Sequence, residues 1–143
     1  METHLLFDKK EIDEELKIGS DLFKESQRTP NLHNKLNVLV LELQRRRAAT
    51  QREYFQKYRE KWEYYTGKAS SEVYKQCPFP FRILKGDIDI YLNSDTELSS
   101  LKQALNELES DISYISEALK QVGQRSYLIR NMMSYLEYLN GLT

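Results

Sequence analysis

The stretch LSSLKQALNELESDISYISEALKQV, residues 98–122, carries the strongest structural signal in the chain. Its apolar residues alternate at spacings of three and four, which is the 3.5-residue repeat of helices that pack along a continuous line. We call this line the heptad seam, and it consists of Leu98, Leu101, Leu105, Leu108, Ile112, Ile115, Leu119 and Val122. The register continues past Gly123 into Ile129, Met133 and Leu136, so the helix either bends at the glycine or continues at a cost of ~1 kcal/mol.

The heptad seam can pack in two ways. It can fold back on the preceding helix as an intramolecular hairpin, or it can meet the same surface of other copies of the chain. Charged residues make up 30% of the sequence and hydrophobic residues 40%, and helical chains this polar often complete their core with copies of themselves. We therefore expect the seam, together with Ile129, to form an oligomer interface.

A second long helix is predicted before the seam. No glycine or proline occurs between Asn31 and Thr66, so one helix could run through that whole stretch. Thr29-Pro30 predicts its start, because a threonine can cap a helix and a proline fits its first turn. Thr66-Gly67 predicts its end, because glycine readily takes the left-handed position after a helix. Its apolar stripe consists of Leu32, Leu36, Leu39 and Leu43.

Shorter elements are predicted elsewhere in the chain. Residues 5–27 suggest an acidic amphipathic helix, broken at Gly19-Ser20, with Leu5, Leu6, Ile12, Leu16 and Ile18 as candidate buried positions. Residues 68–80 suggest a loop. Residues 81–92 fit a strand or a helix, and we prefer the helix because no second strand is evident to pair with it. Ser94 and Glu97 match the spacing of a capping box at the start of the seam helix.

These elements predict a mainly α fold with little or no β structure. We expect an N-terminal helical region, residues 1–75, and a C-terminal oligomerisation region, residues 76–143. No apolar stretch is long enough to span a bilayer, and the N-terminus lacks the layout of a signal peptide. The single cysteine, Cys77, permits no internal disulfide, so we expect a protein of the reducing cytoplasm.

Charge is distributed unevenly along the chain, although the net charge is only -1. Residues 1–29 carry a net charge of -3, residues 30–75 carry +5, and residues 76–143 carry -3. Because salt screens charges beyond about 8 Å, the local field matters more to a polyanion than the total. A polyanion would therefore bind the middle of the chain.

The segment Arg45–Lys68, RRRAATQREYFQKYREKWEYYTGK, interleaves cations with aromatic rings. Binders of single-stranded nucleic acid combine a cationic track for phosphates with rings on which bases stack. The candidate contacts are Arg45, Arg46, Arg47, Arg52, Lys57, Tyr58, Arg59, Lys61, Tyr64, Tyr65 and Lys68. The alternative is a helix whose rings are core and whose charges are solvated, and we expect Phe55 and Trp62 to be core in either case.

Catalytic and cofactor sites have little support. The two histidines and one cysteine show no metal-ligand spacing, and no glycine-rich phosphate loop occurs. Asp87 and Asp89 fit a solvated face better than a nuclease site. We expect no enzymatic activity, no metal and no cofactor.

The sequence REKWEYYTG, residues 59–67, resembles the motif of the UvsY family, the recombination mediators of T-even-type phages. That motif runs basic, any, basic, two intervening residues, Tyr-Tyr, any, Gly. Residues 124–130, QRSYLIR, are similar to the family's Ser-Arg-Gly-Phe-Ala-Ile-Lys stretch, and the resemblance covers about Arg52 to Gly141. Two departures occur: Arg59 and Lys61 stand where the family has Lys and then Arg, and Lys68-Ala69 replaces a second glycine-containing position.

The resemblance implies a function and partners. A UvsY-like protein would bind single-stranded DNA and help a RecA-like recombinase, UvsX, to displace the single-strand-binding protein in the cytoplasm of the infected bacterial host. It would work as a closed homo-oligomeric ring, for which we expect about six or seven subunits. The alternative reading is a coiled-coil scaffold whose basic segment docks an acidic protein.

Overall fold

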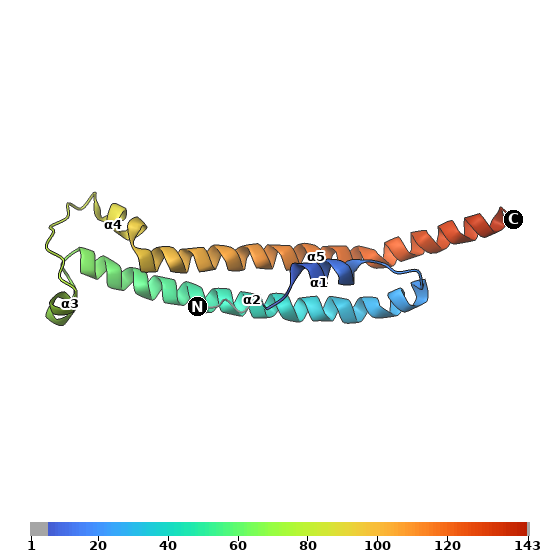
Figure 1. The fold of residues 1–143 in the computed structure, drawn as a ribbon, viewed down its shortest axis with the longest axis horizontal. Coiled ribbons are helices and arrows are strands. Elements are labelled where there is room, and N and C mark those ends of the chain that lie inside the picture. Colours follow the sequence, from blue (N-terminus) through green and yellow to red (C-terminus); the bar gives the residue numbers. More distant parts are fainter. Residues whose placement is uncertain (1–5, 143) are drawn as a thin grey trace. The chain divides into compact units, whose positions relative to one another are not determined.

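The computed structural model describes residues 6–142, and this part of the chain is almost entirely helical (Figure 1). No strand occurs among the described residues, so the predicted mainly α fold is confirmed. The helices in chain order are α1 (Lys9–Leu16), α2 (Leu22–Tyr65), α3 (Ser71–Gln76), α4 (Ile88–Ser94) and α5 (Thr96–Gly141).

Two compact units make up the described chain. The first holds the described residues up to Leu43 together with those from Asp111 onward, and the second is Gln44–Ser110. Within each unit a part of α2 packs against a part of α5 that runs in the opposite direction (Figure 1). Each unit takes residues from both sides of residue 75, so neither coincides with the predicted regions 1–75 and 76–143. The division of function between those regions stays a prediction.

The core of the first unit comes from three helices. Leu36 of α2 and Ile115 of α5 are fully buried, and Ile12 of α1 is 3% exposed. The α2 stripe is largely confirmed, since Leu39 is half-buried and the other three leucines are buried. Of the other candidates before Gly19, Leu6, Leu16 and Ile18 are half-buried, and Leu5 lies outside the described residues.

Helix α1 is attached through tyrosine and arginine side chains of α5. The Tyr114 hydroxyl donates to the backbone oxygen of Lys9 at 3.1 Å and to the carboxylate of Asp13. Arg125, only 2% exposed, donates to the backbone oxygens of Glu15 at 3.3 Å and Leu16 at 3.2 Å. These oxygens lie at the C-terminal end of α1, where a cation is favourable.

Helix α2 begins earlier than the sequence predicted. Pro30 lies inside the helix, so the predicted start at Thr29-Pro30 is wrong. Asp21 provides the cap instead, accepting a hydrogen bond from the amide of Lys24 at 3.1 Å. Arg28 then binds the backbone oxygens of Glu15 and Lys17, at 2.8 and 3.2 Å. These contacts with the end of α1 stabilise the first turns of α2. Helix propensity depends only on neighbouring residues, so it could not predict them.

The predicted end of α2 is confirmed. Gly67 has a φ of 79°, the left-handed conformation that glycine adopts without a Cβ penalty. The amide of Lys68 donates to the oxygen of Glu63 at 2.8 Å, and the amide of Gly67 donates to that of Tyr64 at 3.4 Å. This pair of bonds is the Schellman arrangement, which satisfies carbonyl groups at a helix end.

The connection between α2 and α5 differs from the prediction in three places. The predicted loop over 68–80 contains α3, and the predicted helix over 81–92 begins only at Ile88. The capping-box prediction is wrong by one residue, because Asp95 accepts from the amide of Leu98 at 3.0 Å. The Ser94 hydroxyl instead donates to the oxygen of Ile90 at 2.7 Å, within α4.

The heptad seam packs within the chain along much of its length. Leu98, Ile115, Val122 and Ile129 are buried, and the other seam residues up to Leu119 are half-buried. α5 continues through Gly123. Beyond Ile129 every described residue is exposed, including Met133 and Leu136 at about half of their surface. The intramolecular hairpin is therefore present, and the role of the seam in oligomerisation stays a prediction.

Candidate nucleic-acid interface

All the predicted interface residues except Lys68 lie on the second half of α2, within the second unit. Arg45, Arg46, Arg47 and Arg52 are exposed, and so is Lys68 just beyond the helix end. Tyr58 is 37% exposed, whereas Tyr64 and Tyr65 are half-buried. Phe55 is 60% exposed and Trp62 is 36% exposed, so the expectation that both belong to the core is wrong.

Several of the predicted cations form ion pairs with acidic residues. Arg47 binds Glu109 at 2.8 Å, and its side chain is 44% exposed. Lys57 lies between Glu60 and Glu97, at 3.3 and 3.2 Å. The bond with Glu97, ahead of that with Glu60, raises the pKa of Lys57, so this lysine stays charged at neutral pH.

Lys61 belongs to a partly buried polar network at the start of α5. Its ammonium group lies 3.2 Å from Asp95 and 3.5 Å from Glu97. Asp95 also accepts a hydrogen bond from the Tyr65 hydroxyl at 2.6 Å and caps α5 through the Leu98 amide. Burial by itself raises the pKa of Asp95, but the hydrogen bonds from Tyr65, Leu98 and Lys61 outweigh it and lower that pKa. The network therefore joins the end of α2 to the start of α5.

Arg59 and Lys61 differ in environment although they belong to the same short motif. The Arg59 side chain is 82% exposed and binds Glu63 on the same helix at 3.2 Å. The Lys61 side chain is 22% exposed. Side chains two positions apart on a helix point about 200° from one another, so Arg59 and Lys61 cannot face the same side of α2. Lys61 is therefore held at the start of α5, whereas Arg59 remains on the exposed surface of α2.

Tyr64 and Tyr65 are part of an aromatic cluster that the sequence did not predict. The Tyr64 ring stacks on Tyr74 with centroids 5.6 Å apart, and it lies 5.3 Å from Phe79. Phe79 also contacts Tyr65 at 5.3 Å and Tyr91 at 5.7 Å. The Tyr65 hydroxyl is held by Asp95, and burial together with that bond raises the pKa of Tyr65. These two tyrosines therefore support the structure, and Tyr58 is the more accessible ring of the predicted three.

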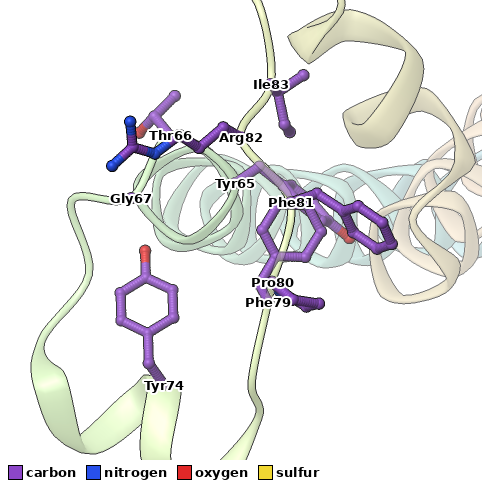
Figure 2. Close-up of a pocket in the computed structure, with 9 residues that line it drawn as sticks. All are labelled: Tyr65, Thr66, Gly67, Tyr74, Phe79, Pro80, Phe81, Arg82 and Ile83. Atoms are coloured by element: carbon purple, nitrogen blue, oxygen red, sulfur yellow. The ribbon is translucent and has the colours of Figure 1, made fainter.

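Some cations of the second unit have no ionic partner among the described residues. Within residues 6–142, Arg52, Arg82 and Lys85 form no ion pair and no side-chain hydrogen bond. The Lys68 ammonium lies 4.4 Å from the centre of the Trp62 ring. Arg82 and Phe81 were missed because they are thirteen or more residues beyond the basic segment, across the connection that contains α3. Only the tertiary structure brings them to the end of α2 (Figure 2).

Other kinds of site find little support in the described part of the chain. No group of three or more His, Cys, Asp or Glu side chains among the described residues could hold a metal ion. No described helix is long and apolar enough to cross a membrane.

Comparison with known proteins gives a consistent result. A family model described as "Recombination, repair and ssDNA binding protein UvsY" matches residues 8–142. One crystal structure of the bacteriophage T4 recombination mediator protein UvsY, lattice type II, covers 92% of this chain and 94% of its own, at 16% identity and a TM-score of 0.81. A second, lattice type I, covers 91% and 96%, at 15% identity and a TM-score of 0.78. At such identities the likeness shows the fold alone. No curated protein matches the sequence.

Proposed function

Because this chain belongs to the UvsY family of recombination, repair and single-stranded-DNA-binding proteins, we propose that it loads a RecA-like recombinase onto single-stranded DNA. The recombinase would be UvsX-like and would replace the single-strand-binding protein during phage homologous recombination in the infected bacterial cytoplasm. The observation that carries this proposal is the family match over residues 8–142. The family is one of non-enzymatic mediators.

The exposed side chains of α2 and the adjoining turn support a division of the predicted interface. We assign phosphate contact to the exposed cations Arg45, Arg46, Arg47, Arg52, Arg59 and Lys68, and base stacking to Tyr58. Lys57, Lys61 and Tyr65 hold the end of α2 against α4 and α5, and Tyr64 holds it against α3 and Phe79. Their contribution to binding is therefore to position the exposed residues.

The exposed end of α5 supports assembly into a ring. From Tyr127 to the end of the described chain, α5 and Leu142 just beyond it expose large apolar side chains over about 40–66% of their surface: Tyr127, Leu128, Met132, Met133, Tyr135, Leu136, Tyr138, Leu139 and Leu142. A concentration of apolar surface on one helix end is typical of an interface with another chain. A ring would present many copies of a weak site to one strand, and linked sites raise avidity without new contacts.

Recombinase loading tests the proposal. The rate of ATP hydrolysis by a RecA-like recombinase would be followed on poly-dT that is first saturated with single-strand-binding protein. We expect this protein to restore hydrolysis on the coated strand, and to have little effect on naked poly-dT. Unchanged hydrolysis on the coated strand would contradict the loading function. A coiled-coil scaffold, in contrast, should show little salt-dependent binding to poly-dT.

A further inference from the structure

A cavity of about 540 Å³ lies at the C-terminal end of α2, within the second unit (Figure 2). Its walls are the last turn of α2 with Gly67, the ring of Tyr74 from α3, and the extended segment Phe79–Ile83. The volume falls within the range of about 300–1,000 Å³ that is usual for small-ligand sites. The lining combines flat rings with one arginine.

The cavity is held in shape by bonds that use up its internal polar groups. The Tyr74 hydroxyl donates to the oxygen of Tyr64 at 2.8 Å, at the end of α2, and accepts from the amide of Ala69 at 3.3 Å. Phe79 is half-buried in the aromatic cluster. Gly67 leaves the space near its Cα open, since no atom lies within 4 Å of where a Cβ would be. The walls are therefore built before any ligand arrives.

Two side chains of the cavity remain available to a ligand. Phe81 is 64% exposed, and its only described ring contact is the edge-on one with Phe79, at 5.7 Å and 69°. Arg82 is exposed and forms no ion pair or hydrogen bond in the described structure. Figure 2 shows its guanidinium group extended beside Thr66 at the end of α2. Figure 2 shows the Phe81 ring and the Arg82 guanidinium on opposite sides of the extended segment, so a single strand would have to cross this segment to contact both. A ring and an unpaired guanidinium are the groups that a base and a phosphate require.

The charge around the cavity matches a polyanion. Residues 66–86 contain Lys68, Lys75, Arg82 and Lys85 against one acidic residue, Glu72. Lys68 lies over the neighbouring Trp62 ring, beyond the last turn of the helix that carries Arg59. A strand that follows the exposed cations of α2 would therefore reach the cavity as it passes the helix end.

We propose that this cavity binds one unstacked nucleobase of the single strand, with Phe81 as the stacking surface and Arg82 as the contact to a phosphate of the same strand where it crosses the extended segment. The inference rests on the proposed function, because it names a base-binding subsite along the same strand. It adds a second base contact to that of Tyr58: the cations of α2 follow the backbone, which is the same in every sequence, and the cavity binds a base at the end of the helix.

The test compares a dT oligonucleotide with an abasic oligonucleotide of the same length and phosphate count, by fluorescence anisotropy. We expect the wild-type protein to bind dT about fivefold or more tightly than the abasic strand, since one stacked base contributes at least this factor. Phe81→Ala should lower that preference by about fivefold, the contribution of one stacked base, and leave abasic binding and the contribution of Tyr58 unchanged. Arg82→Gln should weaken binding to both strands and lower the log–log salt slope by ~0.7, the value for one phosphate.

A matched control is Phe55→Ala, because Phe55 is 60% exposed in the same unit but lies outside the cavity. It should keep the wild-type preference for dT. If circular dichroism shows that Phe81→Ala loses helix, Phe81→Leu carries the same comparison with the contact to Phe79 kept. If the Phe81 variant keeps the wild-type preference for dT, or if the wild type binds both strands equally, the cavity does not bind a base. The proposed function would be unaffected by either result. A wild type that binds neither strand would overturn the proposed function itself.

Discussion

At the scale of single residues, Arg59 and Lys61 show how one basic motif divides between two tasks. Both are cations of α2, yet Arg59 is 82% exposed and Lys61 lies 3.2 Å from the buried carboxylate of Asp95. An exposed ion pair contributes little to folding, whereas loss of one partner of a partly buried pair leaves the other without its hydrogen bond. The two residues should therefore respond differently to the same substitution.

The first prediction compares Arg59→Ala with Lys61→Ala. Arg59→Ala should leave the free energy of unfolding within about 0.5 kcal/mol of wild type and lower the salt slope for poly-dT by ~0.7. Lys61→Ala should destabilise the protein by about 1–3 kcal/mol, since Asp95 loses a charged partner. Urea denaturation and anisotropy titrations measure the two effects. Equal stability losses in both variants would contradict the division.

The second prediction concerns pH. The hydrogen bonds to Asp95 outweigh its burial and lower its pKa in the folded state, so the carboxylate stabilises the fold above its unfolded pKa of about 3.9. This stabilisation is lost as the pH falls through the lower folded value. Asp95→Asn keeps a capping side chain but removes the charge, and should cost about 1–2 kcal/mol at pH 7.

The difference in stability between wild type and Asp95→Asn should start to shrink as the pH falls below about 4, where Asp95 of the unfolded chain becomes neutral, and should be lost once the pH falls through the lower folded pKa. Urea denaturation at pH 7 and near pH 3 gives this difference. Glu25 acts in the same direction in the other unit: its bond with Arg28 lowers its pKa despite partial burial, with Arg125 adding to the effect. Wild type and Asp95→Asn should therefore both lose stability in acid. If the difference in their free energies of unfolding does not change with pH, the charge of Asp95 does not stabilise the network with Lys61 and Tyr65.

At the scale of the elements, the ends of the helices depend on backbone conformation and the middles on packing. The turn that ends α2 contains Gly67, whose φ is positive. Gly123 instead lies inside α5, and the helix continues through it. Neither Gly67 nor Gly123 has an atom within 4 Å of where a Cβ would be, so a methyl group meets no steric obstacle at either position. Only the backbone conformation distinguishes them.

The third prediction uses this pair. Gly67→Ala should destabilise by about 1 kcal/mol, because alanine pays a penalty in the left-handed conformation. Gly123→Ala should stabilise by about 0.5–1 kcal/mol, because alanine is the better helix former. Thermal or urea unfolding of the two variants gives the sign directly. The same sign for both would mean that one of the two backbone conformations differs from that described.

At the scale of the whole molecule, assembly depends on which apolar surface the hairpin leaves uncovered. Ile115 is fully buried within the first unit, so a charge at this position should unfold the unit before it tests any interface. Met133 and Leu136, in the same register, are 50% and 49% exposed. They are therefore the better positions at which to test self-association.

The fourth prediction is that Met133→Lys with Leu136→Lys reduces the mass of the complex without loss of helix. Light scattering and circular dichroism measure the two properties. The control is Asn131→Lys with Ser134→Lys, which adds the same charge at exposed polar positions of the same helix. We expect the control to keep its wild-type mass. If the variant with Met133→Lys and Leu136→Lys keeps the wild-type mass, this end of α5 is not part of the ring interface.

The two long helices and the end of α2 could be predicted from patterns along the sequence. The heptad pattern, the leucine stripe before Arg45 and the glycine at position 67 are local in sequence, and they predicted both long helices and the end of α2. The start of α2 could not be predicted in this way. Its cap at Asp21 and the contacts of Arg28 with the end of α1 outweigh the signal of Pro30.

The candidate site was only partly visible in the sequence, for the same reason. The basic and aromatic composition of residues 45–68 favoured single-stranded nucleic acid, because phosphates and bases require those side chains in any arrangement. Which cations are free and which hold α5 was decided by the position of Asp95 and Glu97, more than thirty residues away. Helical periodicity and residue type follow from neighbours along the chain, whereas ion pairing, exposure and the cavity at Phe81 depend on which segments tertiary packing brings together.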